Sequence, residues 1–381
     1  MRRPLVILLS VTLATSLAPR ATHAQVSATT RPTFVLPADS VVLDIIRRRV
    51  AEKRSVGIVV GLLEPDGRAR VVAYGDPGPG KPPLDGNSVF EIGSITKVFT
   101  ATVLADMVSR GEVKLDDPVQ KYLPATVKLP TRNGKQITLA NLAEQNSGLP
   151  RLPGNMRPAN MANPYADYTV QQMYEFLSSY ELPRDPGAQY EYSNLAVGLL
   201  GHVLALRAGQ SYEAMVRARI LEPLRMTHTA ITLTPQLQSQ LALGHNPAGD
   251  IVANWDLPTL AGAGAIRSTA LDMLRFLRAY LHTATASQPL GAAMALAQRE
   301  RAPTTIPNMG IGLNWHVRHA GADTIVWHNG GTAGYRSFAG FVPSKGIAVV
   351  ILTNSGGAGA DDLGFHLLSP SLALTPARVG Q

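Results

Sequence analysis

The sequence predicts an α/β fold in which one antiparallel sheet is built from both ends of the chain and flanked by helices, with a mostly helical domain inserted. Three observations predict it. Residues 57–74 have the pattern of a β-hairpin, several alternating or apolar segments follow Gly312, and the chain between them is a series of helical segments joined by long loops. Strands at both ends with helices between them indicate one sheet with an inserted helical region.

The first residues have the order of features found in a secretory signal peptide. Two arginines give a basic start, an uncharged apolar run covers residues 5–17, and small residues precede a cleavage site after Ala24. The alternative is a retained membrane anchor, but Pro19 and Arg20 end the run early for a spanning helix. We therefore expect a signal peptide at 1–24, a periplasmic or secreted protein, and no stable membrane insertion after cleavage.

Composition restricts the kind of partner. The formal net charge is +8 and there is no cysteine, so the core must stabilise the fold without disulfides. The basic residues are spread along the chain apart from Arg47-Arg48-Arg49, which lies in a helical pattern typical of a solvated face. Nucleic-acid binding needs a denser basic patch and a recognisable module. We expect a small-molecule substrate and no nucleic acid.

The N-terminal part begins with a helix at about residues 40–53. Apolar and β-branched segments follow at 57–63 and 69–74, and Pro65-Asp66-Gly67 between them is typical of a turn, which predicts the hairpin. The Pro- and Gly-rich stretch 75–86 is expected to be a loop.

Helical periodicity follows, and strand patterns return near the C-terminus. The expected helices cover residues 94–110, 170–178, 194–207 and 212–221, and a further one runs from Ser268-Thr269 to about 281. The expected strands cover residues 312–317, 324–328, 337–342 and 347–353, with a turn at 343–346. We expect an α/β domain made of residues 25–92 and 266–381, and a helical domain at 93–265.

Ser94 and Lys97 form the first candidate motif. Their i, i+3 spacing at the start of a helix places the lysine amine on the same face as the serine hydroxyl. A serine hydroxyl is a poor nucleophile until a base takes its proton, and a lysine can do this if burial lowers its pKa. The Ser94 N–H would point toward a developing oxyanion. For an isolated match, the alternative is a surface lysine on a helix.

Tyr192-Ser193-Asn194 is the second motif, at a junction between a loop and a helix. A phenol there can act as general acid or base when cations lower its pKa. Asn194 can hydrogen-bond both Lys97 and a substrate amide. A helix cap at Ser193 or Asn194, with Tyr192 packed in the core, is the alternative, and both interpretations can hold together.

His328-Asn329-Gly330 is the third motif, and Gly331 follows it. The motif ends a strand and opens into glycines, where a backbone can approach a ligand closely. A cation or donor at His328 could bind a substrate carboxylate or steady Tyr192, and the Gly331 N–H could complete an oxyanion hole. Taken alone, the tripeptide also fits an ordinary turn with a surface histidine.

Other chemistries lack their motifs. The chain has no G-x-S-x-G, no P-loop and no G-x-G-x-x-G opening a helix after a strand. Its nine histidines show no H-E-x-x-H and no spacing of metal ligands, and His316 and His319 are expected to be strand or loop residues. We expect no metal and no cofactor.

In this order, the three motifs resemble those of the penicillin-recognising serine hydrolases. The similar branch has Y-x-N in second place and holds class C β-lactamases, D-Ala-D-Ala carboxypeptidases and family VIII esterases. The resemblance covers roughly residues 40–370 and includes further segments at 90–97, 146–150, 223–229, 263–269 and 349–354.

The resemblance implies a role for each matching residue. Ser94 is similar to the acylated serine, Lys97 and Tyr192 to the proton-transfer pair, and Asn194 to the amide that orients Lys97 and substrate. His328 is similar to the cation of the third motif. The oxyanion hole would correspond to the N–H groups of Ser94 and Gly331.

Two departures from the family pattern concern substrate choice. Class C β-lactamases usually carry Lys-Thr-Gly at the place of His328-Asn329-Gly330, and the histidine loses the fixed charge that binds a β-lactam carboxylate. Their substrate-binding glutamine corresponds to Leu152, with Arg151 beside it. Both departures weaken the case for a dedicated β-lactamase.

The expected function is that of an exported hydrolase that forms an acyl-enzyme on Ser94 and hydrolyses β-lactam or D-alanyl peptide amides. A family VIII-type carboxylesterase and a slowly deacylating penicillin-binding sensor are the alternatives.

Overall fold

The computed structural model describes residues 35–283, 290–357 and 359–376. The expected signal peptide, residues 1–24, lies outside the described residues. From Val35 onward the chain forms one compact unit. Its division into an α/β domain and a helical domain stays a prediction.

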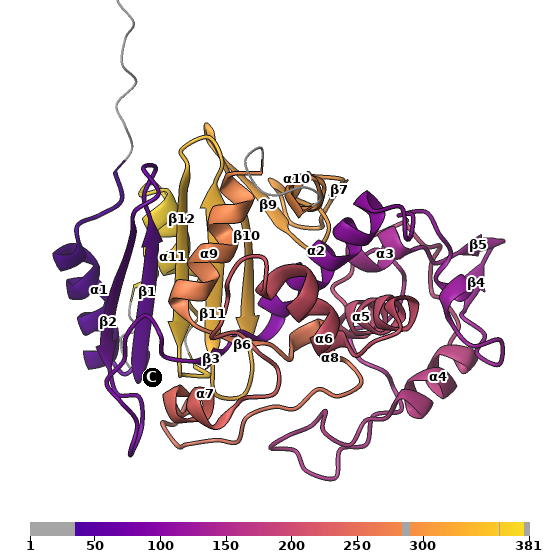
Figure 1. Ribbon diagram of the computed structural model, residues 1–381, viewed down its shortest axis with the longest axis horizontal. Coiled ribbons are helices and arrows are strands. Elements are labelled where there is room, and N and C mark those ends of the chain that lie inside the picture. The colour runs from indigo at the N-terminus through magenta and orange to yellow at the C-terminus, as the bar shows by residue number, and fades with distance from the viewer. Residues whose placement is uncertain (1–34, 284–289, 358, 377–381) are drawn as a thin grey trace, which may run out of the picture. The chain divides into compact units, whose positions relative to one another are not determined.

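The main element is an antiparallel sheet in the order β2-β1-β12-β11-β10-β9-β8-β7 (Figure 1). Its strands are β1 Gly57–Leu63, β2 Ala69–Gly75, β7 Ala302–Pro303, β8 Met309–Ile311, β9 His316–Ala320, β10 Asp323–Gly331, β11 Arg336–Val342 and β12 Ile347–Thr353. β1 pairs with both β2 and β12, which confirms that the N-terminal hairpin joins the C-terminal strands. β1 and β12 are buried along their whole length, as their continuous apolar sequences require.

One predicted strand is wrong. Residues 312–317 were expected to be extended, but β8 ends at Ile311 and β9 begins at His316. Between them Asn314 has a φ of 58°, and the Gly312 N–H donates to the Trp315 carbonyl at 2.8 Å, which makes a tight turn. The apolar residues in this stretch, Leu313 and Trp315, are buried in the core and therefore mimic a strand pattern.

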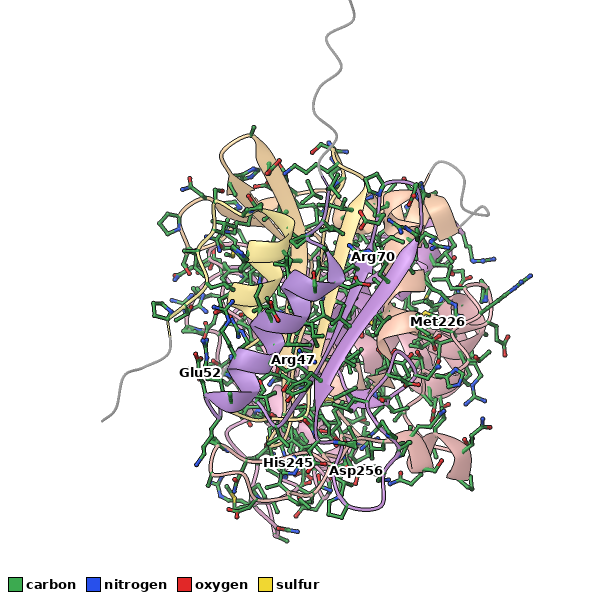
Figure 2. The ribbon with its side chains drawn as sticks, turned by 90° about the vertical axis from the view of Figure 1, so that its left-hand side faces the viewer. Arg47, Glu52, Arg70, Met226, His245 and Asp256 are labelled. Atoms are coloured by element: carbon green, nitrogen blue, oxygen red, sulfur yellow. The ribbon has the colours of Figure 1, made fainter. Side chains whose placement is uncertain are left out.

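Helices cover both faces of the sheet. α1 (Asp39–Ala51) and α11 (Asp361–Leu368) pack on one face and are joined by an ion pair of 2.6 Å between Arg49 and Asp362. Figure 2 shows α1 crossing the strands of the N-terminal hairpin. α9 (Ala270–Leu281) packs on the opposite face, against β1, β11 and β12. The apolar side of α1 is as expected, since Val42, Ile45 and Ile46 are buried. The expectation that Arg47-Arg48-Arg49 forms a solvated face is wrong for Arg49, which is buried because it pairs with Asp362 across the two helices.

The remaining elements form the largely helical part. They are β3 Phe90–Glu91, η1 Gly93–Ile95, α2 Thr96–Ser109, η2 Val119–Tyr122, β4 Thr131–Arg132, β5 Lys135–Gln136, α3 Leu139–Ala143, α4 Val170–Ser179, α5 Asn194–Ala208, α6 Tyr212–Val216, η3 Arg217–Leu221, α7 Pro235–Gln240, α8 Ala261–Gly264, β6 Arg267–Ser268 and α10 Leu290–Gln298. The expected helix at 94–110 is thus a 3₁₀ turn followed by α2. The expected helix at 212–221 is α6 followed by one π-helical turn.

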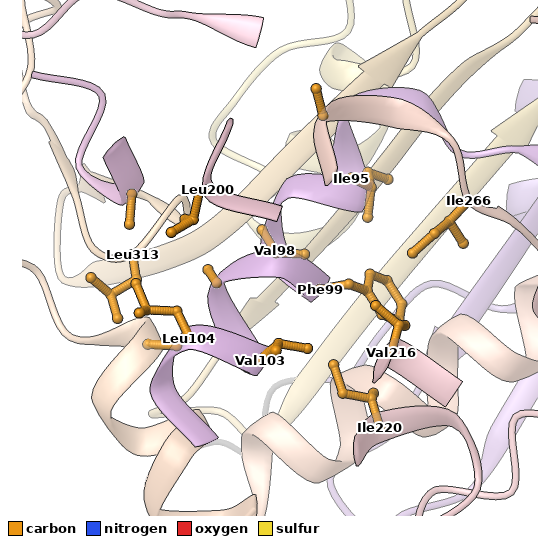
Figure 3. Close-up of a cluster of buried hydrophobic side chains, with 14 of the residues drawn as sticks. Ile95, Val98, Phe99, Val103, Leu104, Leu200, Val216, Ile220, Ile266 and Leu313 are labelled. Carbon is orange, nitrogen blue, oxygen red and sulfur yellow. The ribbon is translucent and has the colours of Figure 1, made fainter. Parts of the chain in front are cut away.

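α2 is the central helix of the molecule. Every residue from Thr96 to Met107 is buried, so this helix has no solvent face (Figure 3). Its two central threonines are satisfied by tyrosine hydroxyls at 2.6 Å, Thr100 by Tyr212 and Thr102 by Tyr280. A helix enclosed in this way holds its N-terminal turn rigidly against the sheet.

Candidate active site

Ser94 lies in η1, where this turn is pressed against the end of β10. Gly93 has a φ of +50°, and a Cβ at that position would lie 2.7 Å from the backbone nitrogen of Gly331. A Cβ on Gly330 would collide with the carbonyl oxygen of Ile92. The glycines therefore allow two backbones to meet, and this contact sets the N–H of Gly331 next to the nucleophile segment. Ser94 is partly exposed and Gly331 is exposed, so both are open to a ligand.

Lys97 is fully buried directly behind Ser94. Its Nζ atom lies 3.0 Å from Ser94 Oγ, 2.8 Å from Asn194 Oδ1 and 2.7 Å from the carbonyl oxygen of Ala263. Two of these three oxygens, those of Asn194 and Ala263, can only accept hydrogen bonds. The amine must donate to both of them, so a neutral amine has its lone pair left for the third neighbour, the Ser94 hydroxyl.

Burial favours that neutral amine. Desolvation lowers the pKa of Lys97 well below its usual value, and the nearby charge of Arg151 lowers it further. Burial is thus in place as a cause that lowers the pKa of Lys97, which was the condition for this lysine to act as a base. The geometry and the pKa together make Lys97 suitable as the base that takes the Ser94 proton.

Tyr192 lies in the loop before α5, with its ring centroid 4.9 Å from Lys97 Nζ. Desolvation raises the pKa of its phenol above the usual value, and this outweighs the lowering by a hydrogen bond with Ser94 and by Arg151. The cation Arg151 does lower this pKa, but burial is the larger effect and the pKa of Tyr192 is raised overall. Tyr192 is held as a phenol, which can donate a proton.

The residues around Tyr192 also form the expected helix cap. The Ser193 hydroxyl accepts from the Ala196 N–H at 2.9 Å and donates to the Pro150 carbonyl at 2.6 Å. This cap begins α5 and fixes Asn194 at its first position, from which the amide reaches Lys97. The second motif thus combines a structural cap with a polar site, as the sequence allowed.

His328 lies next to this cluster but carries no fixed charge. Its ring centroid is 6.3 Å from that of Tyr192 and 5.0 Å from that of His316. Burial lowers the pKa of His328 well below its usual value, with smaller contributions from His316 and Lys97. Its Nδ1 lies 2.6 Å from the Asn329 carbonyl, which can only accept, so the neutral ring carries its proton on Nδ1. His328 is therefore uncharged near neutral pH, so of the two roles considered for it, a cation or a donor, the cation is absent, in line with the loss of a fixed charge at this place.

Asn329 turns away from His328. Successive strand residues face opposite sides, and the Asn329 amide donates to Asp361 Oδ2 on α11 at 2.6 Å. Desolvation raises the pKa of Asp361 to about 6. The structure thus gathers Ser94, Lys97, Tyr192, Asn194, His328, Gly330 and Gly331 at one place, and it engages the side chain of Asn329 with α11.

Several neighbours of this cluster could not be assigned to the site from the sequence. They are the carbonyl of Ala263, the guanidinium of Arg151, the phenol of Tyr165 near Asn194, and His316, whose Nε2 lies 3.0 Å from the Tyr190 hydroxyl. His316 lies on β9 as expected, but its place beside His328 depends on strand pairing. Arg151 had one available signal, its position beside the place of a substrate-binding residue in the similar family.

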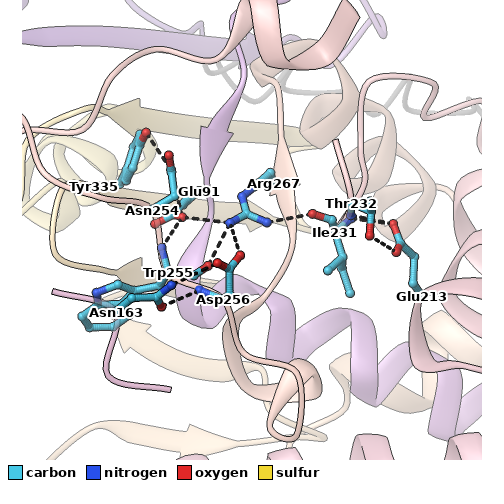
Figure 4. Close-up of polar contacts among 10 residues, drawn as sticks. All are labelled: Glu91, Asn163, Glu213, Ile231, Thr232, Asn254, Trp255, Asp256, Arg267 and Tyr335. Atoms are coloured by element: carbon cyan, nitrogen blue, oxygen red, sulfur yellow. Dashed lines mark hydrogen bonds and ion pairs between the residues drawn. The ribbon is translucent and has the colours of Figure 1, made fainter. Parts of the chain in front are cut away.

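A buried polar network anchors the segment before Ser94 (Figure 4). Glu91 accepts from Asn254 Nδ2 at 2.9 Å and from the Trp255 N–H at 2.8 Å, and it forms an ion pair of 3.4 Å with Arg267. Desolvation raises the pKa of Glu91, and the charge of Arg267 opposes this rise. The network ties β3 and β6 together three residues before the nucleophile.

Other features of the described residues lie elsewhere. Hollows of about 630 Å³ and 880 Å³ are lined by residues such as Glu213 and Arg318, and neither includes Ser94 or Lys97. Within the described residues, no group of three or more His, Cys, Asp or Glu side chains is arranged to hold a metal ion. No helix in the described ranges has the length and apolarity needed to cross a bilayer.

A partly exposed serine backed by a buried lysine and a phenol, on a mixed α/β fold with a large antiparallel sheet, fits a serine hydrolase. The chain belongs to the β-lactamase family, whose model, described as "Beta-lactamase", matches residues 42–368.

Individual relatives agree with this assignment. The chain is 33% identical over 318 residues to the D-alanyl-D-alanine-carboxypeptidase/endopeptidase AmpH of Escherichia coli (strain K12), covering 78% of this chain and 79% of the relative. It is 29% identical to a β-lactamase of Pseudomonas fluorescens, covering 78% of this chain and 88% of the relative. A crystal structure of a class C β-lactamase from Rhodobacter sphaeroides has the same fold, with a TM-score of 0.74, 24% identity, and coverage of 88% of this chain and 99% of that one.

Proposed function

We propose that the protein is an exported hydrolase that forms an acyl-enzyme on Ser94 and hydrolyses β-lactam or D-alanyl peptide amides. The observation that carries the proposal is the environment of Lys97 Nζ, which two obligate acceptors surround so that its lone pair is directed to Ser94 Oγ. The relatives named as a carboxypeptidase and as a β-lactamase support these two substrate classes.

Acylation uses these residues in sequence. Lys97 takes the proton of the Ser94 hydroxyl as Oγ attacks the substrate carbonyl, and the oxyanion is held by the N–H groups of Ser94 and Gly331. Tyr192 gives its proton to the leaving nitrogen as the C–N bond breaks. The Lys97 ammonium then returns a proton to Tyr192, so both groups end neutral. Over the whole acylation step, Ser94 loses one proton and the leaving amine gains one.

Deacylation uses the same groups with water as nucleophile. Lys97 takes a proton from the attacking water, the ester bond to Ser94 Oγ breaks, and the serine oxygen regains the proton. Slow attack at this stage would leave a persistent adduct, which is the behaviour of a penicillin-binding sensor.

Export is part of the proposal. The basic start, the apolar run and the small residues before Gln25 support a signal peptide at residues 1–24. N-terminal sequencing of the protein from a cell envelope fraction tests it, since a mature start at Gln25 is expected.

A second candidate function is that of a carboxylesterase. The neutral, buried His328 favours it, because this third-motif residue supplies no fixed charge for an anionic substrate. Turnover of p-nitrophenyl butyrate, with no turnover of penicillin or D-alanyl-D-alanine peptides, is the result that would select it.

The test of the main proposal is time-resolved intact-mass measurement with benzylpenicillin and with a diacetyl-lysyl-D-alanyl-D-alanine peptide. The wild type should show an adduct of the penicillin mass or release D-alanine, and Ser94→Ala should do neither. A transient adduct with nitrocefin turnover indicates a β-lactamase, and D-alanine release indicates a carboxypeptidase. Equal activity in Ser94→Ala would contradict the mechanism.

A further inference from the structure

The guanidinium of Arg151 lies over the ring of Tyr192, with Cζ 5.0 Å from the ring centroid. The backbone of Arg151 is fixed there, because its carbonyl accepts the Asn194 N–H at 2.9 Å and the Leu195 N–H at 3.3 Å. Its side chain is exposed. A loop residue is thus joined to the start of α5 in a way that holds a cation over the edge of the Ser94 cluster.

This cation has no anionic partner in the part of the chain that the structure describes. Neither an ion pair nor a side-chain hydrogen bond to Arg151 occurs among those residues, whereas Arg267 and Arg219 each contact carboxylates. Arginine usually pairs with carboxylates in a bidentate geometry. An exposed guanidinium that lies over the Tyr192 ring without a carboxylate partner is therefore available to bind an anion.

The charges around Arg151 are consistent with binding of an anion at this place. The positive charge of Arg151 lowers the pKa of Lys97 and opposes the rise in the pKa of Tyr192. Within the described residues, no carboxylate contributes to either pKa, nor to that of His328. His328 itself is neutral. Arg151 is consequently the exposed positive charge over Tyr192 that a ligand meets beside Ser94, whereas the half-buried guanidinium of Arg336 next to Gly331 donates to the carbonyls of Thr332 and Tyr335.

We propose that Arg151 is a specificity-determining residue that binds a substrate carboxylate adjacent to the leaving nitrogen. The position of the carboxylate follows from that of Tyr192. In the proposed mechanism this phenol protonates the leaving nitrogen, and it lies under the guanidinium of Arg151. A carboxylate next to the leaving nitrogen would therefore lie within reach of Arg151. β-Lactams and D-alanyl-D-alanine peptides both carry a carboxylate at this place. The inference rests on the proposed function, and it explains how a site with a neutral third motif selects anionic acyl donors.

The test compares substrates with and without that carboxylate. Kinetic constants are measured for diacetyl-lysyl-D-alanyl-D-alanine, for the same peptide ending in D-alaninamide, and for p-nitrophenyl butyrate. Arg151→Gln should lose about 10- to 100-fold in kcat/KM on the free acid, mainly through KM. It should change the other two by less than about threefold. Arg151→Lys should restore part of the loss by keeping the charge without the fork.

Arg157 provides the matched control. It lies exposed in the same loop, and its guanidinium donates to the carbonyls of Gly154 and Met156 instead of lying over Tyr192. Arg157→Gln should leave all three substrates unchanged, which separates a local effect from a loss of net charge.

Two outcomes contradict different statements. If Arg151→Gln lowers turnover of the acid, the amide and the ester equally, Arg151 acts on Lys97 and Tyr192 and the recognition role is wrong. If the wild type hydrolyses p-nitrophenyl butyrate but neither penicillin nor the peptides, the proposed function fails, and the substrate class assigned to Arg151 fails with it.

Discussion

The side-chain oxygen of Asn194 accepts a hydrogen bond of 2.8 Å from Lys97 Nζ, across 97 positions of the chain. The contact takes one N–H of the lysine and is made by a neutral amide. A neutral acceptor orients the amine and stabilises its charge less than a carboxylate would, so desolvation still keeps the pKa of Lys97 low. The identity of this acceptor therefore sets the pH range in which Lys97 can act as a base.

Exchanging the amide for a carboxylate should shift the pH profile. In Asn194→Asp, the new negative charge favours the ammonium and raises the pKa of Lys97, and since the base must be unprotonated, the acid limb of kcat/KM should move to higher pH. Activity at pH 7 should fall by about 10²-fold and recover as pH rises. Asn194→Ala is the comparison: it should lose activity without that alkaline recovery. An unmoved acid limb in Asn194→Asp would argue against Lys97 as the base.

Removing the phenol should affect substrates according to their leaving groups. Tyr192→Phe cannot protonate an amine, so amide or β-lactam turnover should fall by about 10²- to 10⁴-fold. Nitrophenolate leaves without a proton, so p-nitrophenyl butyrate turnover should fall by less than about tenfold. Steady-state kinetics of the wild type and the variant on both substrates gives the ratio of the two losses. An equal loss on both would instead assign Tyr192 to activation of Ser94.

The close approach of β10 to η1 should tolerate no side chain. In Gly330→Ala the added Cβ meets the Ile92 carbonyl and lies 2.5 Å from Ser337 Oγ. We expect a destabilisation of about 1–3 kcal/mol and a loss of about 10²-fold or more in kcat, because the Gly331 N–H is displaced. Gly359→Ala, where a Cβ meets nothing within 4 Å, is the matched control. Urea unfolding and kinetics on both variants check this, and a fully active Gly330→Ala would remove Gly331 from the oxyanion hole.

Asp361 should make stability depend on pH. Its folded-state pKa of about 6 lies above the usual value of 3.8, so the folded state holds the proton more tightly and stability falls as pH rises between these values. Asp361→Asn keeps an acceptor for Asn329 but cannot ionise. Relative to the wild type, it should gain up to about 3 kcal/mol between pH 4 and pH 7.5. Urea unfolding at the two pH values measures the gain. Parallel curves for both proteins would show that Asp361 does not ionise in this window.

Much of the fold could be predicted because its elements carry local patterns. The hairpin at 57–74 and the strands at 337–342 and 347–353 have strand sequences with turn residues between them, and they occur with only small changes in their limits. The failure at 312–317 has a physical reason: Leu313 and Trp315 are apolar because the core surrounds a turn, and a single left-handed residue, Asn314, interrupts the strand.

The sequence by itself determined which groups are proposed to react and their order along the chain. Ser94 and Lys97 are neighbours through helix geometry alone, and Ser193 caps α5 through a hydrogen bond to a residue three positions on. Such short-range relationships can be predicted from the spacing of residues in the sequence, because backbone geometry fixes them wherever the helix forms.

Only the tertiary structure decided how these groups ionise. The complete burial of Lys97, its contact with the Ala263 carbonyl, the raised pKa of Tyr192 and the neutrality of His328 all come from segments far apart in the chain. A pKa depends on desolvation and on charges within a few ångströms, and both are properties of packing that no local pattern records. The same holds for Arg151, whose cation acquires a role through the ring beneath it.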